Sequence, residues 1–82
     1  MSRSDWVLCQ ITSNPYGDLN AIELRDDSFQ TGSLRVVSYA RPGKLFTASE
    51  SLIVAQVGIL KTGALDRVIK TVIDILHTGI KP

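Results

Sequence analysis

Residues 65–76, which read LDRVIKTVIDIL, carry the clearest structural pattern in the sequence. Their apolar residues recur at intervals of three and four, with charged residues between them, as in a helix with one apolar face. Thr62 is placed to cap the start of this helix and Gly79 to end it. We therefore predict an amphipathic helix from Thr62 to His77 that packs against the rest of the chain. Its apolar face carries Leu65, Val68, Ile69, Val72, Ile73 and Leu76.

Short apolar runs separated by turn residues precede the helix, which is typical of β-strands. The run 6–11 is apolar almost throughout, so we expect it to be covered on both faces. A helix closing a few antiparallel strands gives an α+β fold, and 82 residues make a single domain, 1–82. The predicted strands are 6–11, 21–24, 34–40, 45–47 and 52–57, the last ended by Gly58.

Turn residues are expected at three places between these strands. Residues 14–17, NPYG, have Asn first, Pro second and Gly fourth, which favours a type I turn. Residues 41–44, RPGK, have Pro and Gly at the centre, which favours a type II turn. Phe29 is an isolated apolar anchor before the turn residues 31–33.

The composition limits the classes of partner. Apolar residues make up 44% of the chain and charged residues 21%, so we expect an apolar face covered by a partner, most simply a second copy. A net charge of +1 gives no global attraction to nucleic acid or anionic lipid. Residues 28–49 nevertheless contain Arg35, Arg41, Lys44 and no acid. A phosphate-binding face and ordinary solvated charges are both open interpretations.

Several kinds of site are excluded or disfavoured. One cysteine allows neither an internal disulfide nor a four-thiolate zinc site, and Cys9 lies in an apolar run typical of a buried, inert thiol. His77 is near the helix end, where a cation suits the dipole. With no metal-ligand spacing and no glycine-rich phosphate loop, we expect no metal and no cofactor.

The expected cellular location follows from features that the sequence lacks. No apolar run approaches the roughly 20 residues that span a membrane. The start, residues 1–5, is too short and polar for a signal peptide. We therefore expect a cytoplasmic protein.

Polar residues gather where the first predicted strand ends. Hydroxyls and amides there, near cations of a neighbouring strand, can donate hydrogen bonds to a phosphate and stabilise charge on a pentacoordinate phosphorus. The same residues also suit an ordinary turn, and the residue pattern alone leaves both interpretations open. The cluster consists of Gln10, Thr12, Ser13 and Asn14.

Two segments and the closing helix resemble, in order and spacing, the blocks of PemK/MazF-type toxins. The segments are VLCQITS, residues 7–13, and SYARPGKLFTASESLIVAQVGIL, residues 38–60. The resemblance covers nearly all of the chain, from Asp5 to Ile80. It implies a small antiparallel SH3-like β-barrel with a C-terminal helix, acting as a homodimer. It also implies a growth-inhibiting mRNA interferase that cuts single-stranded RNA without a metal.

The resemblance assigns roles residue by residue. Thr12 matches the threonine that hydrogen-bonds to the scissile phosphate, and Ser13 supports it. The catalytic arginine of the family belongs to an Arg-Pro motif in an upstream strand-loop-strand that has no counterpart in 1–82. The barrel is thus expected to be incomplete, and this chain alone to be inactive. The RNA-binding candidates are Gln10, Asn14, Arg41 and Lys44.

The expected partners follow from the same resemblance. They are a second copy, a cognate antitoxin, single-stranded RNA and, through the antitoxin complex, operator DNA. Two other interpretations stay open. One is a non-catalytic member of the family that binds antitoxin, nucleic acid or itself. The other is an unrelated small barrel that serves as an interaction module.

Overall fold

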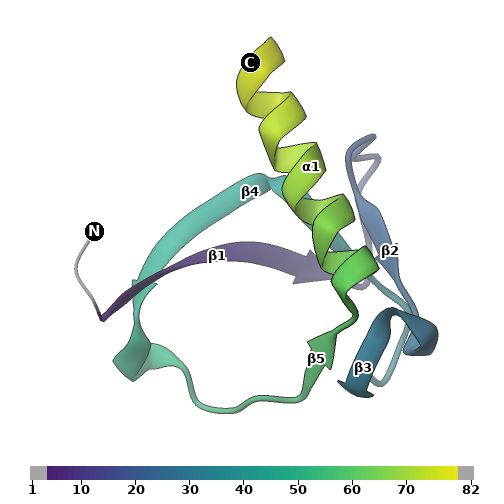
Figure 1. The fold of residues 1–82 in the computed structure, drawn as a ribbon, viewed down its shortest axis with the longest axis vertical. Helices are drawn as coiled ribbons and strands as arrows, with labels where there is room; N and C mark the ends of the chain where they lie inside the picture. The colour runs from purple at the N-terminus through teal and green to yellow at the C-terminus, as the bar shows by residue number, and fades with distance from the viewer. Residues whose placement is uncertain (1–3, 80–82) are drawn as a thin grey trace.

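The structure is a computed structural model that describes residues 4–79. Its strands form two antiparallel sheets, one in the order β1-β4-β2 and one that pairs β3 with β5 (Figure 1). The predicted α+β class is confirmed, and within the described residues the strands do not close into a barrel. The elements are β1 (Asp5–Thr12), β2 (Ile22–Leu24), β3 (Phe29–Gly32), β4 (Ser38–Ser49), β5 (Gly58–Leu60) and α1 (Thr62–Thr78), with 3-10 turns at Asp26–Ser28 and Glu50–Leu52.

Strand β4 is the centre of the larger sheet and pairs with β1 on one side and β2 on the other. Cys9 lies opposite Leu45 but Gln10 lies opposite Arg41, so residues 42–44 bulge out of the ladder. The predicted type II turn at 41–44, and the division into strands 34–40 and 45–47, are therefore wrong. Pro and Gly mark a bulge here, because proline has no N–H to give to the ladder.

The smaller sheet forms where the sequence predicted turns. Two glycines bring its strands together: a Cβ on Gly58 would lie 2.6 Å from the Thr31 carbonyl oxygen, and one on Gly32 would collide with the Val57 carbonyl. Residues 29–32 are thus a strand, and Gly58 begins β5. The predicted strand 52–57 is wrong, because residues 53–57 form neither helix nor strand.

The predicted helix is confirmed with small changes at its start. Gly79, with φ of 77°, follows its last residue as predicted. Lys61 is the N-cap and Thr62 the first helical residue, so the predicted Thr62 cap is wrong by one position. The Lys61 N–H donates to the Ser28 carbonyl (2.9 Å), which holds this residue extended before the helix begins.

The core is small and lies between α1 and the larger sheet. The buried apolar residues are Leu24, Ala40, Ala64 and Val68, which α1, β2 and β4 contribute. Cys9 lies at the edge of this core, half-buried, and burial raises the pKa of its thiol. A thiol with a raised pKa is a poor nucleophile, in line with the predicted inert role.

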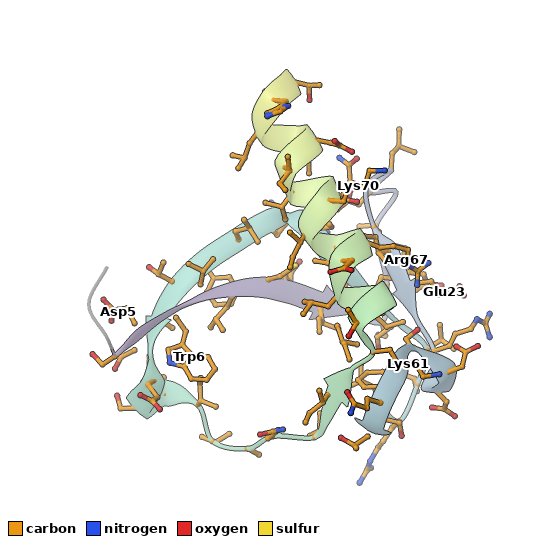
Figure 2. All side chains as sticks on the ribbon, in the orientation of Figure 1. Asp5, Trp6, Glu23, Lys61, Arg67 and Lys70 are labelled. Atoms are coloured by element: carbon orange, nitrogen blue, oxygen red, sulfur yellow. The ribbon has the colours of Figure 1, made fainter. Side chains whose placement is uncertain are left out.

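Much apolar surface is left uncovered by the described residues. Trp6, Val7 and Ile11 of β1 are about half exposed, so the expectation that 6–11 is covered on both faces is wrong for this chain. Figure 2 shows Trp6 pointing into the arch that β1 forms with residues 50–57, away from Lys61, Arg67 and Lys70. Part of the apolar face of α1 is open as well, at Leu65, Ile69, Ile73 and Leu76.

The size of the molecule confirms that it is more open than its mass requires. Its accessible surface is 6316 Å², whereas a compact chain of 9.0 kDa exposes about 4,900 Å². Its radius of gyration is 13.2 Å, against about 12 Å for a compact chain of this length. No helix among residues 4–79 is long and apolar enough to cross a membrane.

Candidate functional site

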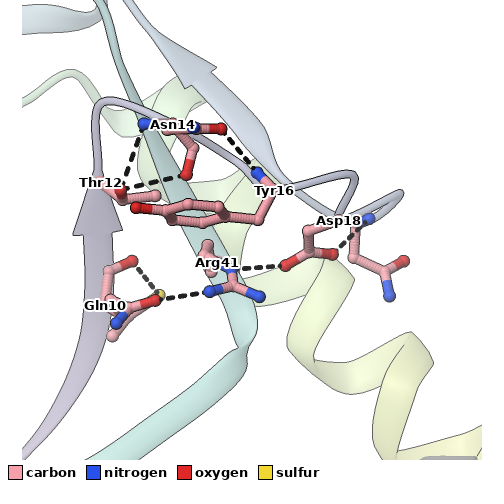
Figure 3. A network of polar contacts seen from close by, with 8 residues as sticks. Gln10, Thr12, Asn14, Tyr16, Asp18 and Arg41 are labelled. Atoms are coloured by element: carbon pink, nitrogen blue, oxygen red, sulfur yellow. Dashed lines mark hydrogen bonds and ion pairs between the residues drawn. The ribbon is translucent and has the colours of Figure 1, made fainter.

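The structure brings Gln10 and Arg41 together at the end of β1. The register places them opposite each other, so their side chains share one face of the sheet. Arg41 Nη1 donates to Gln10 Oε1 at 2.9 Å (Figure 3). The bulge at residues 42–44 makes this contact possible, because it shifts the β1–β4 register so that Gln10 pairs with Arg41. Two of the residues predicted to bind RNA are thus neighbours, although they are 31 positions apart.

Asp18, in the loop that follows β1, is the second residue that binds the Arg41 side chain. Arg41 Nε donates to Asp18 Oδ2 at 2.9 Å, and the two side chains are only 17% and 14% exposed. The Asn20 N–H donates to the other carboxylate oxygen at 2.9 Å. The hydrogen bond from Arg41 lowers the pKa of Asp18, with smaller help from the Asn20 amide and from the charges of Arg41 and Lys44. The charge of Arg41 is therefore largely offset within the cluster.

Thr12 and Asn14 shape the start of the same loop. The Thr12 hydroxyl donates to the Asn14 carbonyl at 3.1 Å and accepts the Asn14 N–H at 3.2 Å. Asn14 Oδ1 in turn accepts the Tyr16 N–H at 2.9 Å. Such side-chain bonds to nearby backbone hold a loop in one conformation. A phosphate oxygen can accept from the Thr12 hydroxyl only if it replaces the Asn14 carbonyl as the acceptor.

The turn in this loop differs from the predicted one. The Asp18 N–H donates to the Pro15 carbonyl at 2.9 Å, and the central residues Tyr16 and Gly17 have φ of 54° and 75°. Two positive φ angles define a type I′ turn that starts at Pro15. The predicted type I turn at 14–17 is therefore wrong. Gly17 satisfies one left-handed position at no steric cost, and Tyr16 occupies the other.

Ser13 and Lys44 are exposed members of the predicted site. Neither side chain makes a hydrogen bond or ion pair with the residues the structure describes. Lys44 lies in the bulge after Arg41, close enough for its charge to act on the Asp18 carboxylate. Within the described part of the chain it adds an unpaired cation to a cluster whose other cation, Arg41, is paired.

Exposed aromatic rings lie further along the same side of β1. Alternate residues of a strand share a side, so Trp6, Leu8 and Gln10 follow one another there, and Phe46 lies opposite Leu8. Trp6 and Phe46 are 47% and 52% exposed. Rings of this kind stack with the bases of single-stranded nucleic acid.

A different hollow of about 350 Å³ lies beside Leu24, the last residue of β2, and is not part of this site. Leu24 and Phe29 line it together with the charged residues 25–27 and residues 34–37. None of the residues predicted to act on RNA lines it. Its Arg25 is paired with Glu23.

The chemistry open to the cluster is phosphate binding more than acid–base catalysis. Asp18 is its one carboxylate, and a lowered pKa makes it a weaker base. Among residues 4–79 there is no group of three or more His, Cys, Asp or Glu that could hold a metal ion.

Sequence reasoning did not single out Asp18 or Tyr16. Asp18 is 23 positions from its partner Arg41, so no local pattern signals the pair. The sequence signal that could have found them is Gly17, which lies between Tyr16 and Asp18 and marks a turn with positive φ.

Compared with known protein families and with curated proteins, the chain matches no family and no individual protein.

Proposed function

We propose that this chain binds single-stranded RNA through the cluster at the end of β1, as part of an endoribonuclease toxin of the PemK/MazF type. The observation that carries the proposal is the arrangement in Figure 3, where Arg41 donates to Gln10 and Thr12 bonds to Asn14 in the loop that follows β1. Gln10, Thr12 and Arg41 come from the two segments that resemble blocks of that family. The resemblance supplies the substrate class, and the geometry supports a phosphate contact.

Arg41 and Lys44 would hold the RNA backbone. Nε and Nη1 of Arg41 bond to Asp18 and Gln10, whereas Nη2 has no hydrogen-bond partner among the described residues. A guanidinium fixed on two nitrogens presents the third in one direction, which favours a charge-assisted bond to a phosphate oxygen. Lys44, which has no ion-pair partner among residues 4–79, adds a second positive charge nearby.

Cleavage in this proposal follows the metal-independent route of the family. The RNA 2′-oxygen forms a bond to the adjacent phosphorus, the bond from phosphorus to the 5′-oxygen breaks, and a proton moves from the first oxygen to the second through the site. The products are a cyclic phosphate and a 5′-hydroxyl. Thr12 would donate to the phosphate. Asp18 is a weak base, so we expect residues 4–79 to bind RNA better than they cut it.

An SH3-like barrel belongs to the same proposal. Strand β1 pairs with β4 alone, so its other edge has free backbone groups among the described residues. Trp6, Val7 and Ile11 are about half exposed on the same strand. A further strand beside β1 would satisfy those groups, cover this surface and bring in the arginine that the family uses for cleavage.

The test compares two arginine substitutions in the 82-residue chain. We expect Arg41→Ala to weaken binding of a short single-stranded 2′-O-methyl oligouridylate, which cannot be cleaved, by on the order of tenfold. Arg35→Ala removes the same charge outside the cluster and should bind like the original chain. Fluorescence anisotropy measures both. Equal effects of the two changes, or no binding at all, would overturn the proposal.

A second candidate function is a non-catalytic interaction module. The uncovered apolar surface favours it, because the chain exposes about 1,400 Å² more than a compact monomer, and one partner of a standard interface buries about 800 Å². A second copy or an antitoxin segment would cover this surface. The mass in solution tests the first of these.

A further inference from the structure

Tyr16 is held in an unfavourable backbone conformation at the edge of the cluster. It is the one non-glycine residue with positive φ among residues 4–79, and aromatic residues rarely adopt this region. Its side chain is 72% exposed, so no burial in the described chain offsets the strain. Because packing does not explain the strained backbone of Tyr16, the strain points to a functional role for this residue.

The turn that strains Tyr16 also fixes Arg41. Its backbone hydrogen bond joins Pro15 to Asp18, and Asp18 then bonds to Arg41 Nε. Figure 3 shows Tyr16 in the same network as Thr12 and Arg41. The one loop therefore places an exposed aromatic ring and a guanidinium with a free Nη2 in the same small region.

We propose that Tyr16 and Arg41 form a subsite for one nucleotide of a single strand. Arg41 Nη2 donates to the phosphate, the Tyr16 ring stacks on the base, and Asp18 is a positioning residue that holds Arg41 Nε and so fixes the direction of Nη2. Stacking does not depend on which base is present, so the subsite takes any base. This inference rests on the proposed RNA binding and adds to it the residues Tyr16 and Asp18.

Two substitutions of Tyr16 separate stacking from backbone effects. Asparagine tolerates the left-handed region, so Tyr16→Asn removes the ring and relieves the strain. We expect it to weaken binding of 2′-O-methyl oligouridylate by on the order of tenfold while raising the melting temperature. Tyr16→Phe keeps the ring and should bind like the original chain. A merely structural role would move affinity and stability in the same direction.

An abasic oligonucleotide of the same length provides the second arm. The original chain and Tyr16→Asn should bind it equally, because no base is left to stack, while Arg41→Ala should still weaken the binding. If Arg41→Ala weakens binding of the base-containing strand and Tyr16→Asn does not, this inference is overturned and the RNA proposal stands. If neither change matters, the RNA proposal itself fails.

Discussion

At the scale of single residues, Asp18 matters most because it ties the loop after β1 to the sheet. Arg41 Nε donates to Asp18 Oδ2 at 2.9 Å, and both side chains are mostly shielded from solvent. Removing the carboxylate would free the guanidinium and release the loop that carries Tyr16. The pair thus contributes both to stability and to the geometry of the proposed RNA site.

This pair gives the protein a pH dependence at acid pH. The pKa of Asp18 is lower in the folded chain than its ordinary value of 3.8, chiefly because Arg41 donates to it. The stability from this pair is therefore fully present above pH 3.8 and is lost as the pH falls through the lowered value. Denaturant unfolding at a series of pH values should show this loss in the original chain.

Asp18→Asn should reduce the loss of unfolding free energy at acid pH. Asp66→Asn, on the exposed side of α1, should leave that loss unchanged. The role of the pair is contradicted if both variants lose stability with acid as steeply as the original chain.

At the scale of elements, the β3–β5 pair depends on two glycines. A Cβ on Gly58 would lie 2.6 Å from the Thr31 carbonyl oxygen and 3.1 Å from the Phe29 ring. Backbone cannot yield as a flexible side chain can, so the strands must separate. Because β5 leads directly into α1, this pair also sets where the helix starts.

Alanine substitutions at two glycines should change stability in opposite directions. We expect Gly58→Ala to destabilise the fold by about 1–3 kcal/mol, as overpacking does. Gly63→Ala, in the first turn of α1 with no atom within 4 Å of the added Cβ, should stabilise it by about 0.4–1 kcal/mol. Urea unfolding measures both. A neutral Gly58→Ala would show that β3 and β5 do not approach as described.

The elements also show which features the sequence could predict. Helix α1 was predictable because its period of three to four residues extends over many positions. The bulge at 42–44 was not, because Pro-Gly suits a turn and a bulge equally well. Residues 52–57 have the composition of a strand, yet no partner strand lies beside them in the described chain. In the site, local patterns located Thr12 and Asn14, but the Asp18–Arg41 pair spans 23 positions.

At the scale of the whole molecule, the chain has more apolar surface than its own elements cover. On α1 the charged residues Asp66, Arg67, Lys70 and Asp74 occupy one side. The opposite side is apolar, and part of it is open to solvent at Ile69 and elsewhere. A contiguous apolar patch of this kind marks an interaction surface.

We therefore expect the purified chain to self-associate. Light scattering should give a mass above the 9.0 kDa of one copy. Ile69→Glu places a charge on the open apolar side of α1 and should lower that mass toward one copy. Lys70→Glu introduces the same residue on the charged side and should leave the mass unchanged. A monomer in every case would contradict self-association through this surface.

The salt dependence of RNA binding shows whether Arg41 contacts a phosphate, because it counts phosphate contacts. The logarithm of the association constant for single-stranded 2′-O-methyl oligouridylate falls linearly with the logarithm of the salt concentration. Arg41→Ala should make this slope shallower by about 0.7, the value of one phosphate contact on a single strand, and Arg35→Ala should leave it unchanged. An unchanged slope for Arg41→Ala would contradict the assignment of the cluster to a phosphate.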